Sequence, residues 1–179
     1  MTSRAFNRDF AWRMTGNQAA TAASLLSEAA ARTGPIDLVI AIARGGTQPA
    51  HNVAAALGVP VHTVRARHNP TDAIYAQATG HVSCDLTEAD PVFGRLLVVD
   101  DICGTGATLS VVTSALSGLA KPGTALVTAT LCRNAASLYQ PDLTVWDGLR
   151  EWVIFPWEAA PPDGLPVRDL PDPRQVLVA

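Results

Sequence analysis

Short apolar stretches alternate with helix-forming stretches along the chain, and this alternation predicts its secondary structure. Residues 17–31 are rich in alanine and carry apolar side chains at helical spacing, so we expect an amphipathic helix that ends before Gly34-Pro35. Residues 36–43 are almost wholly apolar, which is typical of a short strand buried in a parallel sheet. Residues 47–57 and 59–64 then repeat the pattern as a helix and a strand.

The same alternation returns in the second half of the chain. We expect a strand over residues 96–100, a helix over 107–119, a turn at 121–123 and a strand over 124–131. Strands that alternate with helices of this length predict a Rossmann-like, doubly wound α/β fold whose sheet is mainly parallel.

Two segments depart from this pattern. Residues 65–91 are mostly polar, and they are too long for a structureless connector in a compact domain. We expect either a functional lid over about 67–91 or a small hairpin. The segment after Pro141 is rich in aromatic residues, and the proline-rich tail beyond Ala159 is expected to wrap the surface.

Composition places the chain among compact globular proteins. Its 179 residues, 48% hydrophobic and 16% charged, predict a single domain over 1–179. The net charge of −3 and the single lysine, Lys121, argue against a basic stripe that binds nucleic acid. Cys84, Cys103 and Cys132 lack CxxC spacing, so we expect neither a disulfide framework nor a structural zinc site.

Neither a membrane segment nor a secretory signal is indicated. No apolar stretch approaches the length that spans a bilayer, and residues 1–12 contain no apolar signal-peptide region. We therefore expect a cytoplasmic protein that does not contact membranes.

The strongest chemical signal follows the strand at 96–100. Asp100 and Asp101 stand at its carboxyl end, where open α/β sheets bind their ligands. The turn at 104–108 offers backbone N–H groups and hydroxyls at a helix N-terminus, which suits a phosphate. The carboxylates would repel that phosphate, but they can accept hydrogen bonds from sugar hydroxyls or hold a cation through water. Together they indicate a ribose 5-phosphate site; the alternative is an ordinary turn with a capping threonine and a solvated acidic pair.

This run resembles the signature of the type I phosphoribosyltransferases, which bind phosphoribosyl pyrophosphate (PRPP). The matching residues are Val98-Val99-Asp100-Asp101 and Thr105-Gly106-Ala107-Thr108. The resemblance implies the fold of that family, with a core of about 8–145, a flexible lid loop, and a small base-binding hood and tail built from the C-terminal segment of about 146–179. It also implies that Asp100 and Asp101 act in catalysis and hold a metal through water. The 5′-phosphate would bind to Gly104, Thr105, Gly106, Ala107 and Thr108.

A second glycine turn, Arg44-Gly45-Gly46, follows the strand at 36–43. Glycine permits close backbone approach, and an arginine fork can hold pyrophosphate. In the resembled family, a loop at this place binds the pyrophosphate of PRPP, so Arg44 and Gly45 are expected to do so here. Arg65 and Arg67 alternate at the end of the next strand, where they either face the pyrophosphate or are solvated.

The aromatic run at 151–158 is either core or a platform for a ligand. It is similar to the base-binding segment of the xanthine–guanine phosphoribosyltransferases. That resemblance implies Trp152 as the ring that stacks on a purine, Val153 as a backbone contact and Glu158 as a carboxylate near the metal and pyrophosphate. Arg133 falls where those enzymes bind the 6-oxo group with a lysine.

One position departs from the resembled pattern. The 6-oxopurine enzymes usually carry an aspartate near purine N7 as the proposed proton acceptor, and Gly104 stands there in this chain. Either another group accepts the proton, or the substrate is not a standard 6-oxopurine.

We therefore expect an enzyme that transfers the 5-phosphoribosyl group from PRPP to a purine-like base, most simply a 6-oxopurine. The resemblance implies Mg²⁺ as the cofactor and a homodimer or homotetramer, with PRPP and a nucleobase as the partners. Two alternatives stay open: a PRPP- or nucleotide-sensing regulator with little catalysis, and a phosphoribosyltransferase for a non-purine acceptor.

Overall fold

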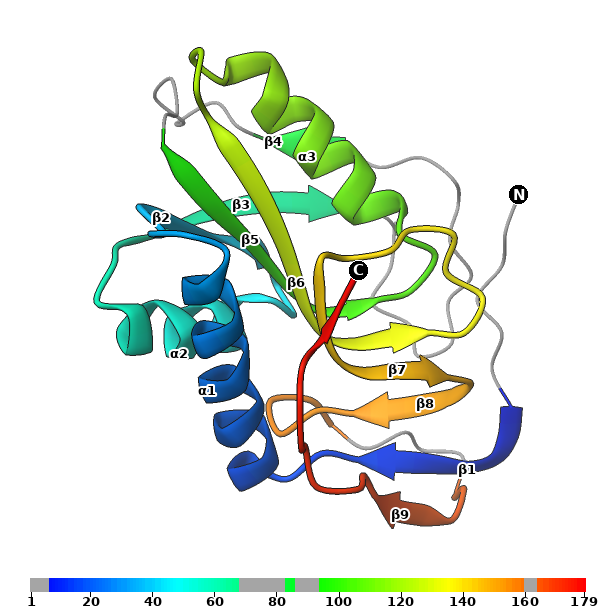
Figure 1. Cartoon of the computed structure of the whole chain (residues 1–179). Helices are drawn as coiled ribbons and strands as arrows, with labels where there is room; N and C mark the ends of the chain where they lie inside the picture. Colours follow the sequence, from blue (N-terminus) through cyan, green and yellow to red (C-terminus); the bar gives the residue numbers. More distant parts are fainter. Residues whose placement is uncertain (1–6, 68–82, 86–93, 160–163) are drawn as a thin grey trace.

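The computed structural model describes residues 7–67, 83–85, 94–159 and 164–179, which form two sheets and three helices (Figure 1). The larger sheet has the strand order β10-β7-β6-β5-β2-β3-β4. Its members are β2 (Leu38–Ala43), β3 (Val61–Arg67), β4 (Ser83–Asp85), β5 (Arg95–Cys103), β6 (Ala125–Asn134), β7 (Leu143–Leu149) and β10 (Leu177–Val178). The five central strands are parallel, and β4 and β10 pair antiparallel at the two edges. The mainly parallel α/β fold expected from the sequence is thus confirmed.

Central strand β5 is buried on both faces of the large sheet. Its apolar side chains alternate between two clusters: Leu97 and Val99 join one, whereas Leu96 and Val98 join the other. All four are fully buried, as expected for a parallel strand covered on both sides. Helices α1 (Gly16–Arg32) and α2 (Thr47–Leu57) contribute to the first cluster, and α3 (Ala107–Leu119) to the second.

The three helices lie close to the predicted ranges. They differ in how their first turns are capped, and this difference affects the site. Helix α1 begins with a capping box in which Thr15 Oγ1 accepts from the Gln18 backbone and Gln18 Oε1 accepts from the Thr15 backbone. Helices α2 and α3 instead follow glycines, Gly46 and Gly106, and neither has a side-chain cap. The N-termini of these two helices therefore lie next to glycine turns at the carboxyl ends of β2 and β5.

A separate sheet of three strands forms the hood, which we define as β1 (Asn7–Arg13), β8 (Glu151–Ile154) and β9 (Val167–Asp169). All its pairings are parallel, with β1 in the centre (Figure 1). The predicted division of the chain needs correction at two places. Strand β1 belongs to the hood and not to the core, because it pairs only with β8 and β9 within the described residues. Strand β7 extends the large sheet past residue 146, because it pairs with β6.

The predicted lid falls largely outside the described residues. What is described is that β3 and β4 pair antiparallel, with Arg65 opposite Asp85 and Arg67 opposite Ser83. The expected proline-rich tail does run along the surface and adds β10 to the edge of β7 (Figure 1).

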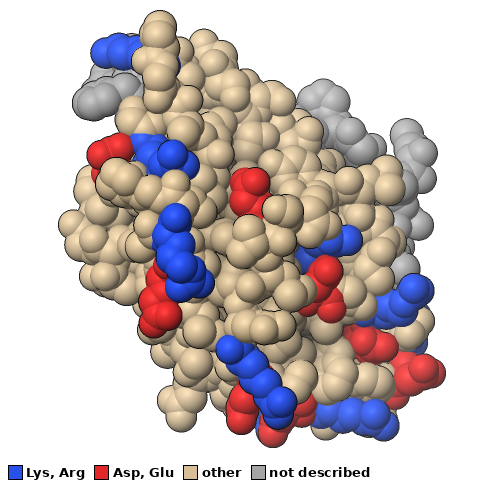
Figure 2. Space-filling view, viewed as in Figure 1, with Lys and Arg blue, Asp and Glu red and all other residues tan. Residues whose placement is uncertain are grey.

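Charge is distributed without a dominant sign on the face drawn in Figure 2, where Lys and Arg side chains lie beside Asp and Glu. Among the described helices, none is both long and apolar enough to cross a membrane.

Candidate active site

The site is organised by the carboxyl end of β5. Asp100 and Asp101 are both buried there, with 8% and 6% of their surfaces exposed. Both residues line one small pocket at the strand end. Asp101 also donates its backbone N–H to Oδ1 of Asp100 at 3.0 Å, which ties the Asp100 carboxylate to the strand end. The pair therefore presents two carboxylates at one point of the sheet edge.

A small pocket of about 90 Å³ lies at the predicted phosphate-binding turn. Its lining residues are Asp100, Asp101, Ile102, Cys103, Gly104, Thr105, Gly106, Thr108 and Leu109. Of the five residues predicted for the 5′-phosphate, all but Ala107 line this pocket. Ala107 is the first residue of α3, and its N–H donates to Thr105 Oγ1 at 3.3 Å. The first turn of α3 carries no acidic residue, so the positive end of the helix dipole is available to an anion.

A larger pocket of about 220 Å³ adjoins the first. It is lined by Gly45, Asp101, Ile102, Trp152, Val153, Phe155 and Glu158. Asp101 and Ile102 line both pockets, so the two spaces meet at the end of β5. The fold thus brings together the acidic pair, the glycine turn after β2 and the aromatic segment, three motifs that lie far apart in the sequence.

The turn after β2 lies so close to Asp101 that only glycine fits at position 45. A Cβ added to Gly45 would overlap the Asp101 carboxylate, and one added to Gly46 would lie 2.5 Å from the carbonyl oxygen of Val99. Arg44 is exposed, and its peptide bond with Ala43 is cis. Arg65 is exposed and lies on β3 opposite Ala43, one residue before the turn. The side chain of Arg67 lies outside the described residues.

The hood supplies the opposite wall of the larger pocket. Val153 is buried, and its side chain belongs to the main core cluster, so the group that it can offer to a ligand is its backbone. Trp152 is partly buried beside it. The segment then turns at Phe155-Pro156-Trp157-Glu158, where the Glu158 N–H donates to the Phe155 carbonyl at 3.0 Å. The rings of Phe155 and Trp157 stack at 5.3 Å, which fixes the turn that carries Glu158.

Arg133 is held apart from these groups. It lies on β6 opposite Cys103, and its guanidinium binds Gln140 through Nη1. Nε is buried and lies 3.3 Å from Oδ1 of Asp147, an ion pair whose geometry is not that of a hydrogen bond. The described residues that line the two pockets do not include Arg133.

Four lining residues were not predicted as site residues: Ile102, Cys103, Leu109 and Phe155. Ile102 follows the acidic pair directly, and Phe155 lies two positions after Val153, so their proximity to the motifs was the available signal.

The thiol of Cys132 is buried close to the negative charge of Asp101. Burial raises the pKa of its thiol well above the ordinary value, and the negative charge of Asp101 raises it further. The thiol therefore stays protonated at neutral pH and acts as a small apolar core group.

The donor chemistry of the acidic pair fits a hard cation, since carboxylate oxygens are the ligands that Mg²⁺ prefers. Within the described part of the chain, no three His, Cys, Asp or Glu side chains cluster as a metal site. A magnesium ion here would therefore need further oxygens from the substrate or water.

Comparison with known proteins agrees with this geometry. The family model for the phosphoribosyl transferase domain matches residues 15–163. A purine phosphoribosyltransferase from Pyrococcus horikoshii is 26% identical, with a TM-score of 0.70 over 84% of this chain and 96% of that one.

Two further solved structures share the fold at lower identity. A Helicobacter pylori xanthine-guanine-hypoxanthine phosphoribosyltransferase is 18% identical, with a TM-score of 0.65 over 83% of this chain and 93% of that one. A Neisseria gonorrhoeae protein with bound ppGpp is 20% identical, with a TM-score of 0.72 over 86% and 92%. The search of curated proteins gave no match.

The strand, acidic pair and phosphate turn at the end of β5 are thus explained by the family that the whole domain matches. The chain belongs to the phosphoribosyl transferase domain family and is a PRPP-dependent pentosyltransferase.

Proposed function

We propose that the acceptor of the phosphoribosyl group is a purine base, with a 6-oxopurine as the simplest substrate. The observation that carries this proposal is the adjacency of the two pockets. A phosphate-sized space at the turn before α3 meets a larger, partly aromatic space at Asp101. A ribose 5-phosphate in the first would direct its anomeric carbon, C1′, toward a base in the second.

The proposed roles follow from this placement. Gly104, Thr105, Gly106 and Thr108 hold the 5′-phosphate together with the N-terminus of α3. Asp100 and Asp101 hold the ribose hydroxyls and stabilise positive charge that develops at C1′. In the reaction, a base nitrogen bonds to C1′ while the bond from C1′ to pyrophosphate breaks and its electron pair leaves with pyrophosphate. The base nitrogen loses its proton to a pyrophosphate oxygen or to water. No covalent enzyme intermediate is required.

Pyrophosphate is assigned to the turn after β2. Gly45 offers its backbone beside Asp101, and the exposed Arg44 and Arg65 provide positive charge on neighbouring strand ends. Arg67 is proposed for the same role on the basis of sequence alone. Mg²⁺, held by Asp100 and Asp101 through water and by Glu158 nearby, would neutralise charge on the leaving pyrophosphate.

The base is assigned to the hood. Trp152 is proposed to stack on the purine ring and the Val153 backbone to contact its edge. Arg133 is proposed to reach the 6-oxo group, which would require its guanidinium to leave Gln140 and Asp147. We further propose that the protein works in the cytoplasm as a homodimer or homotetramer.

A substrate panel tests the proposal. The protein would be incubated with PRPP, Mg²⁺ and one base at a time: hypoxanthine, guanine, xanthine, adenine, orotate or uracil. Nucleoside monophosphate formation and pyrophosphate release would both be followed, and turnover is expected with at least one 6-oxopurine. Turnover with orotate or uracil alone would replace the purine by a pyrimidine acceptor. Saturable PRPP binding without turnover of any base would favour a sensor over an enzyme.

A further inference from the structure

The segment between β6 and β7 lies against the phosphate-binding turn, although no sequence motif marks it. Both its ends are anchored to the large sheet. At the start, Asn134 is buried, its Oδ1 accepts from the Ala136 N–H at 3.0 Å, and its carbonyl accepts from the Ser137 N–H at 2.9 Å. At the end, Oδ2 of Asp142 accepts from the N–H and hydroxyl of Thr128, each at 2.7 Å. The segment 135–141 is therefore held as a fixed bridge across the end of the sheet.

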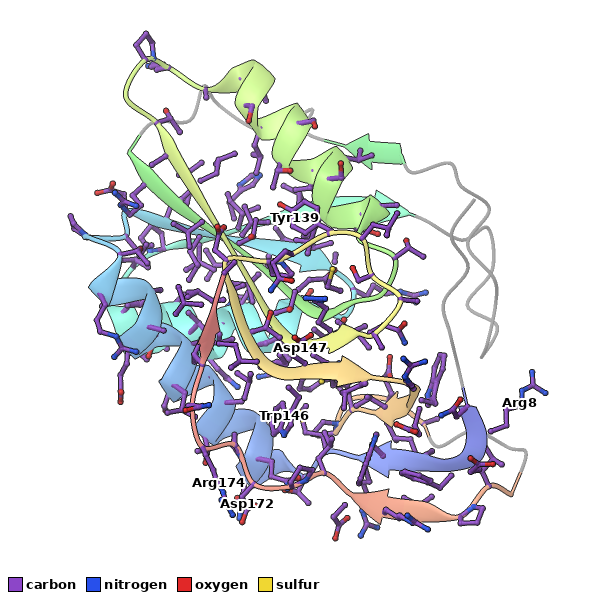
Figure 3. The ribbon with its side chains drawn as sticks, turned by 45° about the vertical axis from the view of Figure 1, so that its right-hand side comes forward. Arg8, Tyr139, Trp146, Asp147, Asp172 and Arg174 are labelled. Atoms are coloured by element: carbon purple, nitrogen blue, oxygen red, sulfur yellow. The ribbon has the colours of Figure 1, made fainter. Side chains whose placement is uncertain are left out.

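The bridge contacts the turn at Gly106. Gly106 has a φ of +89°, and a Cβ placed on it would overlap the Cβ of Tyr139. The backbone of Tyr139 is also near, with its N and Cα at 3.1 and 3.2 Å from that added atom. Figure 3 shows Tyr139 on the loop that passes beside α3. Because Gly106 is also the residue from which α3 starts, the position of Tyr139 limits where the phosphate turn can lie.

Ser137 links this contact to β5 through a buried set of hydrogen bonds. Its hydroxyl donates to the Tyr139 carbonyl at 3.0 Å and accepts from the Tyr139 N–H at 3.3 Å. The Sγ atom of Cys103 lies 3.2 Å from the same hydroxyl. The same Sγ atom lies 3.9 Å from the Tyr139 carbonyl oxygen, so the thiol, the hydroxyl and this carbonyl form one hydrogen-bonded group. Cys103 and Ser137 are both buried, so these bonds are shielded from water.

We propose that Ser137 is a positioning residue for the 5′-phosphate: it holds Tyr139 against Gly106 and thereby fixes the phosphate-binding turn. The inference rests on the proposed phosphate site, but it assigns a role to residues outside that pocket. Ser137 and Tyr139 do not line the pocket, so they act through Gly106 and Cys103, which do.

The test compares ligands that occupy different parts of the site. Ribose 5-phosphate reports on the phosphate turn, and inorganic pyrophosphate with Mg²⁺ reports on the turn after β2. In Ser137→Ala, loss of the hydroxyl is expected to weaken ribose 5-phosphate binding by about 3- to 15-fold, as for one buried hydrogen bond. Pyrophosphate affinity should stay within about twofold, and the KM for PRPP should rise more than the KM for the base. Calorimetry and initial rates measure these effects.

Two controls separate positioning from a general loss of structure. Ser117→Ala removes an exposed hydroxyl on α3 that donates to the Thr113 carbonyl. This variant should leave every affinity unchanged. Cys103→Ala removes the other side chain that contacts the Ser137 hydroxyl and should resemble Ser137→Ala. This variant also serves if Ser137→Ala fails to fold.

Native affinity for ribose 5-phosphate in both Ser137→Ala and Cys103→Ala would overturn the proposal, as would an equal loss of pyrophosphate affinity. If the native protein itself does not bind ribose 5-phosphate, the phosphate site and the proposed function are wrong together. A native protein that binds it, with variants that bind equally well, refutes only the role of Ser137.

Discussion

At the scale of single residues, Gly45 is a position where a side chain would overlap the site directly. The loop after β2 contacts Asp101 through its backbone, and Asp101 in turn lines both pockets. Any side chain at position 45 must displace either the loop or a buried carboxylate that is proposed to hold the ribose.

Gly45→Ala is therefore expected to lower kcat/KM for PRPP by about 100-fold, because a displacement of about 1 Å in an active site is enough for a loss of this size. Initial-rate kinetics with PRPP as the varied substrate measure the effect. Gly118→Ala is the matched control, since a Cβ there has open space and the residue lies in α3 away from both pockets. Equal activity of the two variants would show that Asp101 tolerates the displacement.

Trp152 supports a second prediction at this scale. If its ring stacks on the base, Trp152→Ala should raise the KM for the base by about 10- to 100-fold, the equivalent of about 1–3 kcal/mol of stacking. The KM for PRPP should change less than about twofold. Trp152→Phe keeps an aromatic face and should recover most of the affinity. A parallel rise in both KM values would rule out the stacking assignment.

At the scale of elements, the helix starts divide into those that stabilise the fold and those that lie at the site. Helix α1 has a side-chain capping box, whereas α2 and α3 start from glycines beside the pockets. Capping residues satisfy the first N–H groups of a helix, so a start without one leaves more of those groups for a ligand. In α3 one of them, the N–H of Ala107, donates to Thr105 Oγ1.

Thr15→Ala removes the capping box of α1 and is expected to lower the free energy of unfolding by about 1 kcal/mol. This loss corresponds to a fall in Tm of about 2–4 °C for a chain of this size. Thermal unfolding followed by circular dichroism measures the change, and kcat/KM should be unaltered because α1 does not line either pocket. Thr21→Ala, at an exposed position in the middle of α1, should not destabilise the protein.

Elements formed by local sequence pattern were the predictable ones. Helices α2 and α3 have the predicted bounds, and β2, β3, β5 and β6 lie within a few residues of theirs. The hood strands β1, β8 and β9, and strands β7 and β10, were not predicted as strands. The hood strands pair with segments more than 100 residues away, and β10 lies at the chain end. Their pairing depends on contacts that no local pattern specifies.

At the scale of the whole molecule, the C-terminal tail joins the hood to the large sheet. After β9, Leu170 is buried in the main core, and the Pro171 carbonyl accepts from the indole N–H of Trp146 at 2.9 Å. Gln18, at the start of α1, donates to the Leu170 carbonyl at 2.6 Å. Figure 3 shows Trp146 and Asp172 in this region, between β7, α1 and the tail. These contacts support our proposal that residues 1–179 unfold as a single unit.

Leu170→Ala should therefore destabilise the whole protein by about 2–4 kcal/mol, because it leaves a cavity in the shared core. Denaturant unfolding should show one transition by both tryptophan fluorescence and circular dichroism. Val178→Ala, where the side chain is 69% exposed, should change the stability by less than about 0.5 kcal/mol. Two separated transitions in the native protein would argue for an independent hood.

The sequence by itself determined the helices and central strands, the acidic pair with the glycine-rich turn after it, and the family. These features depend on local periodicity and on residues close together in the chain. Tertiary structure decided what lies next to what. It brought Trp152, Val153, Phe155 and Glu158 to Asp101, placed β1 in the hood, and directed Arg133 toward Gln140 and Asp147. It also set Tyr139 against Gly106. The physical reason is that such contacts depend on packing between distant segments, which the spacing of residues along the chain does not encode.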